Sequence, residues 1–149
     1  MNAETVILGA HAGATVCMVG VIWTCQLVHY PMMSLVPAER FIAYEAEHMR
    51  RISWIVGPAM VAELGCAVWL AVRVPAGVGG LAAWGMLGAL AVIWLSTAAL
   101  QGPMHGRLAR GYDAGLIARL VATNWVRTVA WTARGVGAVW MLAVSGRGA

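Results

Sequence analysis

Three histidines and a glutamate fall near one end of the apolar segments of this chain. They are His29, Glu45, His48 and His105. Glu45 and His48 form a Glu-x-x-His step, which turns both side chains to one face of a helix and is the step that carboxylate-bridged metal bundles use. Histidines with a carboxylate also suit a single zinc, iron, copper or manganese ion. The spacing therefore favours a metal site. The alternative is a solvated interfacial helix on which Glu45, Glu47 and His48 pair with nearby arginines: Arg40, Arg50 and Arg51.

Amides and an arginine form a second polar layer, roughly 5 to 10 Å deeper at the rise of an α-helix. Its candidate substrate-binding residues are Gln26, Asn124 and Arg127. An arginine beside an amide could hold a carboxylate, a quinone oxygen or a porphyrin propionate. The alternative is a set of interhelical hydrogen bonds that fixes helix packing.

Glu63 and Arg134 form a third layer, each about 21 Å from the same boundary, and we expect them to be partners. As catalytic residues they would make Glu63 a proton-relay carboxylate. As an architectural pair they would stabilise the core, because removing either one strands a buried charge. His11 lies nearer the opposite end, where it could ligate a haem or bond to a backbone carbonyl.

The elements that carry these residues are predicted to cross a membrane. Hydrophobic residues make up 61% of the 149 residues and charged residues only 11%, which is typical of membrane proteins rather than of soluble domains. Four segments supply the predominantly apolar length of about 20 residues that a transmembrane helix needs; they cover residues 5–30, 38–73, 81–101 and 113–144. We expect an all-α integral membrane protein, an antiparallel four-helix bundle in a single domain, 1–149.

Proline and glycine mark expected features of these helices. Pro31 and Pro103 are expected to end the first and third helices, and Pro58 to kink the second. Small residues are expected to permit close helix approach; they are Gly9, Gly13, Gly20, Gly85, Gly88, Gly135 and Gly137. No internal repeat is apparent in the sequence.

Arginines indicate which way the helices cross. The two loops on one side carry most of them, whereas the other side has Arg73 and Arg147. The positive-inside rule places the arginine-rich side in the cytoplasm and both termini on the opposite side. This topology explains the basic composition without nucleic acid as a partner, and the expected location is a bacterial inner membrane. Lysine is absent, which excludes Schiff-base chemistry.

Several short motifs suggest a family. They are His11 followed by Trp23, the run His29-Tyr30-Pro31, the run Glu47 to Arg51 leading to Gly57-Pro58-Ala59-Met60, the corner Gln101 to His105, and the stretch Asn124 to Arg127. In these the chain resembles a loose group of small four-helix bacterial membrane proteins that includes the four-helix protoporphyrinogen oxidase, the copper-resistance D domain and the anthrone-oxygenase-like proteins. The resemblance implies a redox or oxygenase-type protein with a haem or metal cofactor, and it places His11 at the haem ligand of the oxidase. That oxidase family also relies on a lysine in its third helix, which this sequence lacks.

The leading functional hypothesis is a membrane oxidoreductase whose histidine and carboxylate cluster opens to the inner leaflet and acts on a lipophilic or quinone-like substrate. No phosphate loop or nucleophile elbow points elsewhere. The alternative is a non-catalytic subunit of a larger membrane complex, in which the buried polar groups fix helix packing. Transport through the layer of Glu63 and Arg134 is a third hypothesis, which would require a homo-oligomer.

Overall fold

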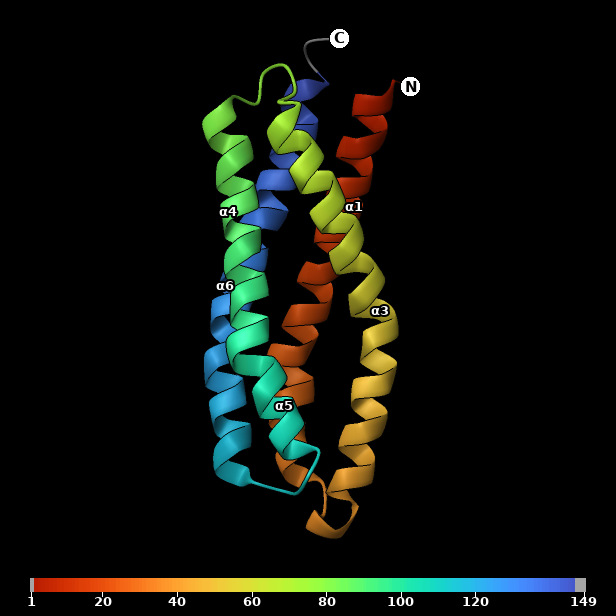
Figure 1. The fold of residues 1–149 in the computed structure, drawn as a ribbon, viewed down its shortest axis with the longest axis vertical. Helices are drawn as coiled ribbons and strands as arrows, with labels where there is room; N and C mark the ends of the chain where they lie inside the picture. Colours follow the sequence, from red (N-terminus) through yellow and green to blue (C-terminus); the bar gives the residue numbers. More distant parts are fainter. Residues whose placement is uncertain (1, 147–149) are drawn as a thin grey trace.

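The computed structural model describes residues 2–146, which form helices and short connections and contain no strand. The elements are α1 (Ala3–Thr24), a π-helix (Cys25–His29), α2 (Tyr30–Met32), a 3-10 turn (Met33–Leu35), α3 (Ala38–Val72), α4 (Gly80–Ser96), a second π-helix (Thr97–Gln101), α5 (Gly102–Leu108) and α6 (Ala114–Ser145). Each π-helix joins the α-helices on either side of it, so the chain makes four long helical rods (Figure 1).

The four rods lie side by side along the long axis of the molecule, and both labelled chain ends are at the same end (Figure 1). The first rod packs against α3 and α6, and α4 packs against the same two helices. The all-helical prediction is confirmed for the described residues. Three buried apolar clusters, centred on Phe41, Leu90 and Leu70, follow one another along the interior.

Local chemistry sets where the rods begin and turn. The Asn2 side chain accepts a hydrogen bond from the Thr5 N–H at 2.9 Å, and Asp113 accepts one from the Leu116 N–H at 2.9 Å, so each caps a helix start. Gly77 and Gly79 have φ angles of 81° and 76° in the turn between α3 and α4. Side chains with a Cβ rarely adopt these angles.

The expectation that Pro31 and Pro103 end their helices is wrong. A proline ring inside an α-helix clashes with the carbonyl four residues earlier. Here the turn before each proline widens: the N–H of Tyr30 bonds to the Cys25 carbonyl, and that of Gly102 to the Thr97 carbonyl. The helical path therefore continues to Leu35 and Leu108. Pro58 also lies inside a continuous helix, α3.

The same construction occurs twice, although the sequence shows no clear repeat. A long apolar helix passes into a π-helix of five residues, then into a short helix with a Pro-Met step, and a connection leads to the next long helix. Single π-turns in α-helices are frequent at functional sites. In this protein they precede Tyr30 and His105, which meet in the interior.

Three helical stretches among the described residues are long and apolar enough to cross a membrane: Ala3–Leu35, Ala38–Val72 and Gly80–Leu108. The fourth rod, α6, is not one of them, because it carries polar and charged residues. The interior-facing ones, Asn124, Arg127, Thr128 and Arg134, are buried against the other rods. Large apolar side chains cover the outside, including Trp54, Val61, Leu81 and Trp84. These features are consistent with an integral membrane protein.

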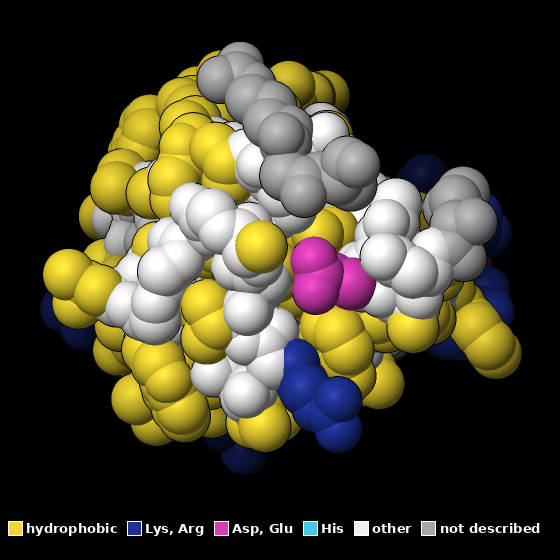
Figure 2. All heavy atoms as spheres, turned by 90° about the horizontal axis from the view of Figure 1, so that it is seen from above, with side chains coloured by type: hydrophobic (Ala, Val, Ile, Leu, Met, Phe, Trp, Pro, Cys, Tyr) yellow, Lys and Arg dark blue, Asp and Glu magenta, His cyan; other side chains and the backbone are white. Residues whose placement is uncertain are grey.

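Charge is distributed unevenly between the two ends. The end that carries the chain termini is mainly hydrophobic or uncharged, with one small acidic area and one basic area in the foreground (Figure 2). Its described charged residues are Glu4 in the first turn of α1 and Arg73 at the end of α3. The opposite end holds Arg40 in the first turn of α3, Arg107 in α5 and Arg110 in the connection to α6. The arginines that the sequence places on one side of the helices thus lie at one end of the molecule.

Most of the glycines expected to permit close helix approach do not do so. A Cβ added at Gly9, Gly13, Gly20, Gly85 or Gly88 would meet no described atom within 4 Å. Of these seven glycines only Gly135 and Gly137, both in α6, lie against a neighbouring helix: a Cβ at Gly135 would lie 2.8 Å from Val19, and one at Gly137 2.5 Å from Met86. Close approach is therefore confined to the contacts of α6 with α1 and α4.

Candidate functional site

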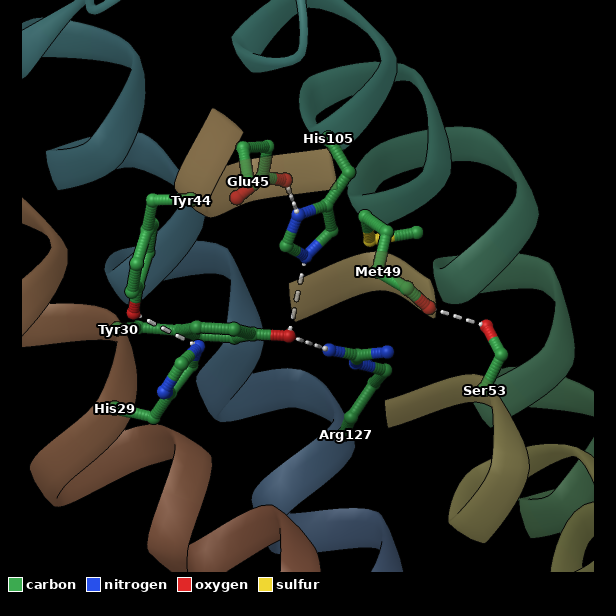
Figure 3. Close-up of polar contacts among 8 residues, drawn as sticks. All are labelled: His29, Tyr30, Tyr44, Glu45, Met49, Ser53, His105 and Arg127. Carbon is green, nitrogen blue, oxygen red and sulfur yellow. Dashed lines mark hydrogen bonds and ion pairs between the residues drawn. The ribbon is translucent and has the colours of Figure 1, made fainter. Parts of the chain in front are cut away.

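Four buried side chains from different parts of the chain form one hydrogen-bonded line, which we call the relay: Glu45, His105, Tyr30 and Arg127 (Figure 3). The Nδ1 atom of His105 lies 2.6 Å from Oε1 of Glu45, and its Nε2 atom lies 3.3 Å from the Tyr30 hydroxyl. Arg127 Nη2 donates to the same hydroxyl at 3.2 Å. The relay joins α3, α5, α2 and α6 across the interior.

A guanidinium can only donate, so the Tyr30 oxygen accepts from Arg127. In the tautomer in which a neutral His105 donates from Nδ1 to Glu45, its Nε2 atom accepts the proton of the Tyr30 hydroxyl. If the Tyr30 proton moved to His105, the resulting imidazolium would lie beside a carboxylate and the resulting tyrosinate beside a guanidinium. Both new charges would be stabilised, so the relay is suited to proton exchange at the Tyr30 oxygen.

The two ends of the relay carry charges that the protein leaves incompletely paired. Oε2 of Glu45 has no hydrogen-bond partner within the described part of the chain, although the side chain is fully buried. Arg127 forms no ion pair with any carboxylate of residues 2–146. Each guanidinium nitrogen donates to a neutral oxygen, of Asn124, Thr97 or Tyr30. Buried charges are normally paired, but Arg127 lacks a counter-charge among the described residues, and a ligand oxygen would supply it.

An amide network behind Arg127 holds the guanidinium in place. Asn124 Oδ1 accepts from Arg127 Nε at 3.0 Å and from Nη2 at 2.5 Å, while its amide donates to Gln26 Oε1 at 2.9 Å. Gln26 in turn donates to the Val121 carbonyl at 3.1 Å and accepts from the Thr128 hydroxyl at 3.2 Å. The three predicted substrate-binding residues are brought together, but Gln26 and Asn124 position Arg127 instead of reaching the cavity.

An interior cavity of about 190 Å³ lies against the relay. Its polar end is formed by Tyr30, His105 and Arg127, with Gln101 and Thr97 beside them. The rest of the wall is mainly apolar and includes Met18, Val21, Ile22, Met49, Ile52, Val56 and Trp131. A mainly apolar cavity with a few convergent polar groups is the usual form of a small-molecule site. Among the described residues, Arg127 is the only arginine, lysine or carboxylate side chain that lines it.

His29 and His48 lie beside the relay but outside it. Their rings are stacked with centroids 4.0 Å apart, and the His29 Nε2 atom is 3.4 Å from the Tyr44 hydroxyl. The ring centroids of His48 and His105 are 5.6 Å apart. The structure therefore gathers His29, His48, His105 and Glu45 into one region, as the sequence predicts, but as two separate pairs.

Within residues 2–146 no three His, Cys, Asp or Glu side chains are placed so that they could hold one metal ion. Both ring nitrogens of His105 already have partners, Glu45 and Tyr30. The donors as arranged do not fit a metal ion, and His105 could ligate one only by giving up its contact with Glu45 or with Tyr30. The expected metal ligands remain a prediction, and no chemical step below is derived from them.

The alternative, a solvated interfacial helix, is wrong for Glu45 and correct for Glu47, two residues further along α3. Glu45 has 0% exposed surface and faces His105. Glu47 points outward and pairs with Arg50 at 2.7 Å and with Arg51 at 2.5 Å. Two residues, about half a turn of α3, thus separate an interior carboxylate from an exposed one.

The deeper pair forms as predicted. Arg134 Nη2 lies 2.9 Å from Glu63 Oε1, and both side chains are fully buried. Thr15 donates to Oε1 of the same carboxylate at 2.9 Å and Trp131 to Oε2 at 3.0 Å. Arg134 also donates to the Met86 carbonyl. Glu63 is thus bonded to α1 and α6, and Arg134 to α3 and α4, which is the pattern of an architectural centre.

His11 belongs to this same centre. Its Nε2 atom accepts from Arg134 Nη2 at 3.2 Å, whereas Nδ1 has no partner among the described residues. The expected backbone-carbonyl partner is therefore replaced by a guanidinium. A haem iron would have to displace Arg134 from Nε2, so the residues present do not fit a haem at His11, and its role as a cofactor ligand remains a prediction.

Tyr30 is a residue of the site that the sequence did not predict. Its hydroxyl is hydrogen-bonded to His105 and to Arg127, and the side chain lines the cavity. A tyrosine is common at a membrane boundary, and only its place directly before Pro31, within one turn of His29, could have drawn attention to it. Comparison with protein-family models, curated proteins and solved structures finds no match for this chain.

Proposed function

We propose that this chain is an integral membrane protein of four transmembrane helices, with α6 as the fourth. The polar residues of α6 lie inside, where the other rods cover them, so lipid meets mainly its apolar face. By the positive-inside rule the end with the relay is cytoplasmic and both termini lie on the other side. The expected membrane is the bacterial inner membrane. The relay then lies close to the inner leaflet.

We further propose that the interior cavity binds a small lipophilic molecule through a carbonyl or phenolic oxygen, as a quinone-like compound would provide. The observation that carries this proposal is the position of Arg127. Its guanidinium has no carboxylate partner among residues 2–146, is only 7% exposed, and lines a mainly apolar cavity. An oxygen with partial or full negative charge would supply the missing interaction.

The relay gives this site its chemistry. Tyr30 would donate its proton to the bound oxygen, with Arg127 stabilising the tyrosinate that remains. In the reverse direction His105 would take the Tyr30 proton, with Glu45 stabilising the imidazolium, and the tyrosinate would then accept a proton from the ligand. An oxidoreductase or oxygenase role, which the family resemblance implies, needs such proton exchange.

Equilibrium binding tests the proposal. A substituted benzoquinone would be titrated into the protein in lipid nanodiscs, with Arg127→Gln as the variant and Arg119→Gln, an exposed arginine of the same helix, as the control. We expect Arg127→Gln to weaken binding by about tenfold to a hundredfold, as loss of a charge-assisted hydrogen bond does. Equal affinity of the two variants, or no binding to the wild type, would contradict the proposal.

A non-catalytic subunit is the second candidate function, and the centre at Glu63 favours it. Every oxygen of that carboxylate is hydrogen-bonded, and its partners come from α1 and α6. Such a centre fixes packing without requiring a ligand. Purification from membranes in mild detergent distinguishes the two candidates: a stable assembly with larger subunits supports this one, and quinone binding by the isolated protein supports the first.

A further inference from the structure

The cavity is not closed on the side where α1 and α3 meet. Two adjoining hollows of about 440 and 360 Å³ lie along this seam on the outside of the molecule. Both are lined by His29, His48, Ile52 and Ile55. We call the two together the seam groove.

The seam groove and the interior cavity share part of their walls. Val21, Cys25, His48 and Ile52 line the cavity on one side and the larger hollow on the other. These side chains therefore form the wall between the cavity and the larger hollow. The stacked rings of His29 and His48 stand at the boundary of this passage.

The larger hollow of the seam groove suits hydrocarbon, whereas the smaller one also carries the exposed pair of Glu47 and Arg51. The larger hollow is lined by Gly20, Cys17 and Ile55 together with the shared residues. A Cβ added at Gly20 would meet no described atom within 4 Å, so open space lies directly over the backbone of α1. Both α1 and α3 belong to stretches apolar enough to cross a membrane, so this space faces lipid.

The sizes of the two spaces set what each can hold. In another protein, an apolar cavity of about 150 Å³ takes up one benzene molecule. The interior cavity, at about 190 Å³, therefore accommodates one substituted ring and no long chain. A chain attached to that ring therefore needs a way out of the cavity, and the passage between α1 and α3 offers one.

We propose that the substrate is an amphiphile with a single-ring headgroup and a flexible hydrocarbon tail, and that the tail runs through the α1–α3 seam into the seam groove. This inference rests on the proposed function, because the headgroup is the ring bound at Tyr30 and Arg127. The substrate thus reaches the site sideways from the bilayer.

Two ligands with the same headgroup, one with a tail and one without, test this inference separately from the proposed function. A dimethoxy-methyl-benzoquinone and the same ring with a decyl tail would be titrated into the wild type and two variants in nanodiscs. Ile55→Trp fills the seam groove without lining the cavity, and Val61→Trp places the same bulk on an exposed position of α3. Lipid solvates a hydrocarbon tail as well as the groove does, so the tail adds little affinity of its own. A side chain that fills the groove therefore weakens binding by leaving the tail no space, not by removing favourable contacts.

We expect Ile55→Trp to weaken binding of the tailed ligand by at least about tenfold and to leave the tailless ligand unchanged, while Val61→Trp changes neither. Gly20→Leu and its control Gly9→Leu repeat the comparison on α1, where an added Cβ at either position meets no described atom within 4 Å. If Ile55→Trp does not fold, this second pair tests the inference in its place. Equal binding of both ligands by the groove variants would overturn the inference and leave the proposed function standing. Failure of the tailless ligand to bind the wild type would instead overturn the proposed function.

Discussion

The Tyr30 hydroxyl lies 3.3 Å from Nε2 of His105, although the two residues are 75 positions apart in the chain. Each follows a π-helix of five residues and lies close to a proline: Tyr30 directly precedes Pro31, and His105 comes two residues after Pro103. The other ring nitrogen of His105 bonds to Glu45 at 2.6 Å. One imidazole therefore connects a buried carboxylate to a cavity-lining hydroxyl, and several consequences of this arrangement can be measured.

Removing the imidazole should destabilise the protein strongly. In His105→Phe the buried Glu45 carboxylate would lose its only hydrogen-bonding partner among the described residues. A stranded buried charge costs about 3 to 5 kcal/mol, which thermal unfolding in detergent would measure.

Arg50→Gln is the matched control, because it removes a partner of the exposed Glu47. Water solvates that carboxylate, so we expect a much smaller change. Similar losses for the two variants would show that Glu45 is not the buried charge that the structure describes.

The pair of Glu63 and Arg134 should behave as an architectural unit. Glu63→Gln leaves Arg134 buried without a counter-charge, and we expect a loss of about 3 to 5 kcal/mol in unfolding free energy. The double variant Glu63→Gln, Arg134→Gln should recover part of this loss, because it removes the stranded charge. Losses that simply add would contradict the account, and so would a double variant less stable than either single one.

Glycines on α6 and on α4 should respond differently to one added methyl group. In Gly135→Ala the new Cβ would lie 2.8 Å from Val19 Cγ2, and valine is stiff at χ1 in a helix. We expect a loss of about 1 to 3 kcal/mol from overpacking. Gly88→Ala has open space and should gain up to about 1 kcal/mol from helix propensity. Equal melting temperatures would argue against close packing of α1 on α6.

Membrane orientation can be tested with single cysteines in a background lacking the native ones. Arg110→Cys lies at the arginine-rich end, and Ala76→Cys lies in the turn at the other end. Under the proposed topology a membrane-impermeant maleimide added to intact spheroplasts labels Cys at 76 and not at 110. The reverse pattern would place the relay at the outer leaflet.

Composition and spacing were sufficient to predict the helices and the heights of their polar groups. Apolar length identified the segments, and counting along the helical rise placed Glu63 level with Arg134, which do form a pair. The same counting placed Glu45 level with His105. Height along a helix follows from sequence, because the rise per residue is constant.

Rotation about a helix axis and local departures from α-geometry could not be predicted in this way. The widened turns before Pro31 and Pro103 extend both helices and turn Tyr30 towards His105. Sequence rules treat an interior proline as a stop or a kink. Likewise, only coordinates show that Gly20 faces open space while Gly135 faces Val19, since glycine is compatible with both.

The central claim is that the cavity presents Tyr30 and Arg127 to an oxygen of a lipophilic ligand. Infrared difference spectroscopy of a bound benzoquinone with an isotope-labelled carbonyl tests it most directly, because hydrogen bonding lowers the carbonyl stretching frequency. We predict a lowered frequency in the wild type that moves back towards the free value in Tyr30→Phe and is unaffected in Tyr112→Phe, whose hydroxyl bonds to the Ser34 carbonyl at 3.3 Å. A bound carbonyl with the same frequency in the wild type and in Tyr30→Phe would contradict the account.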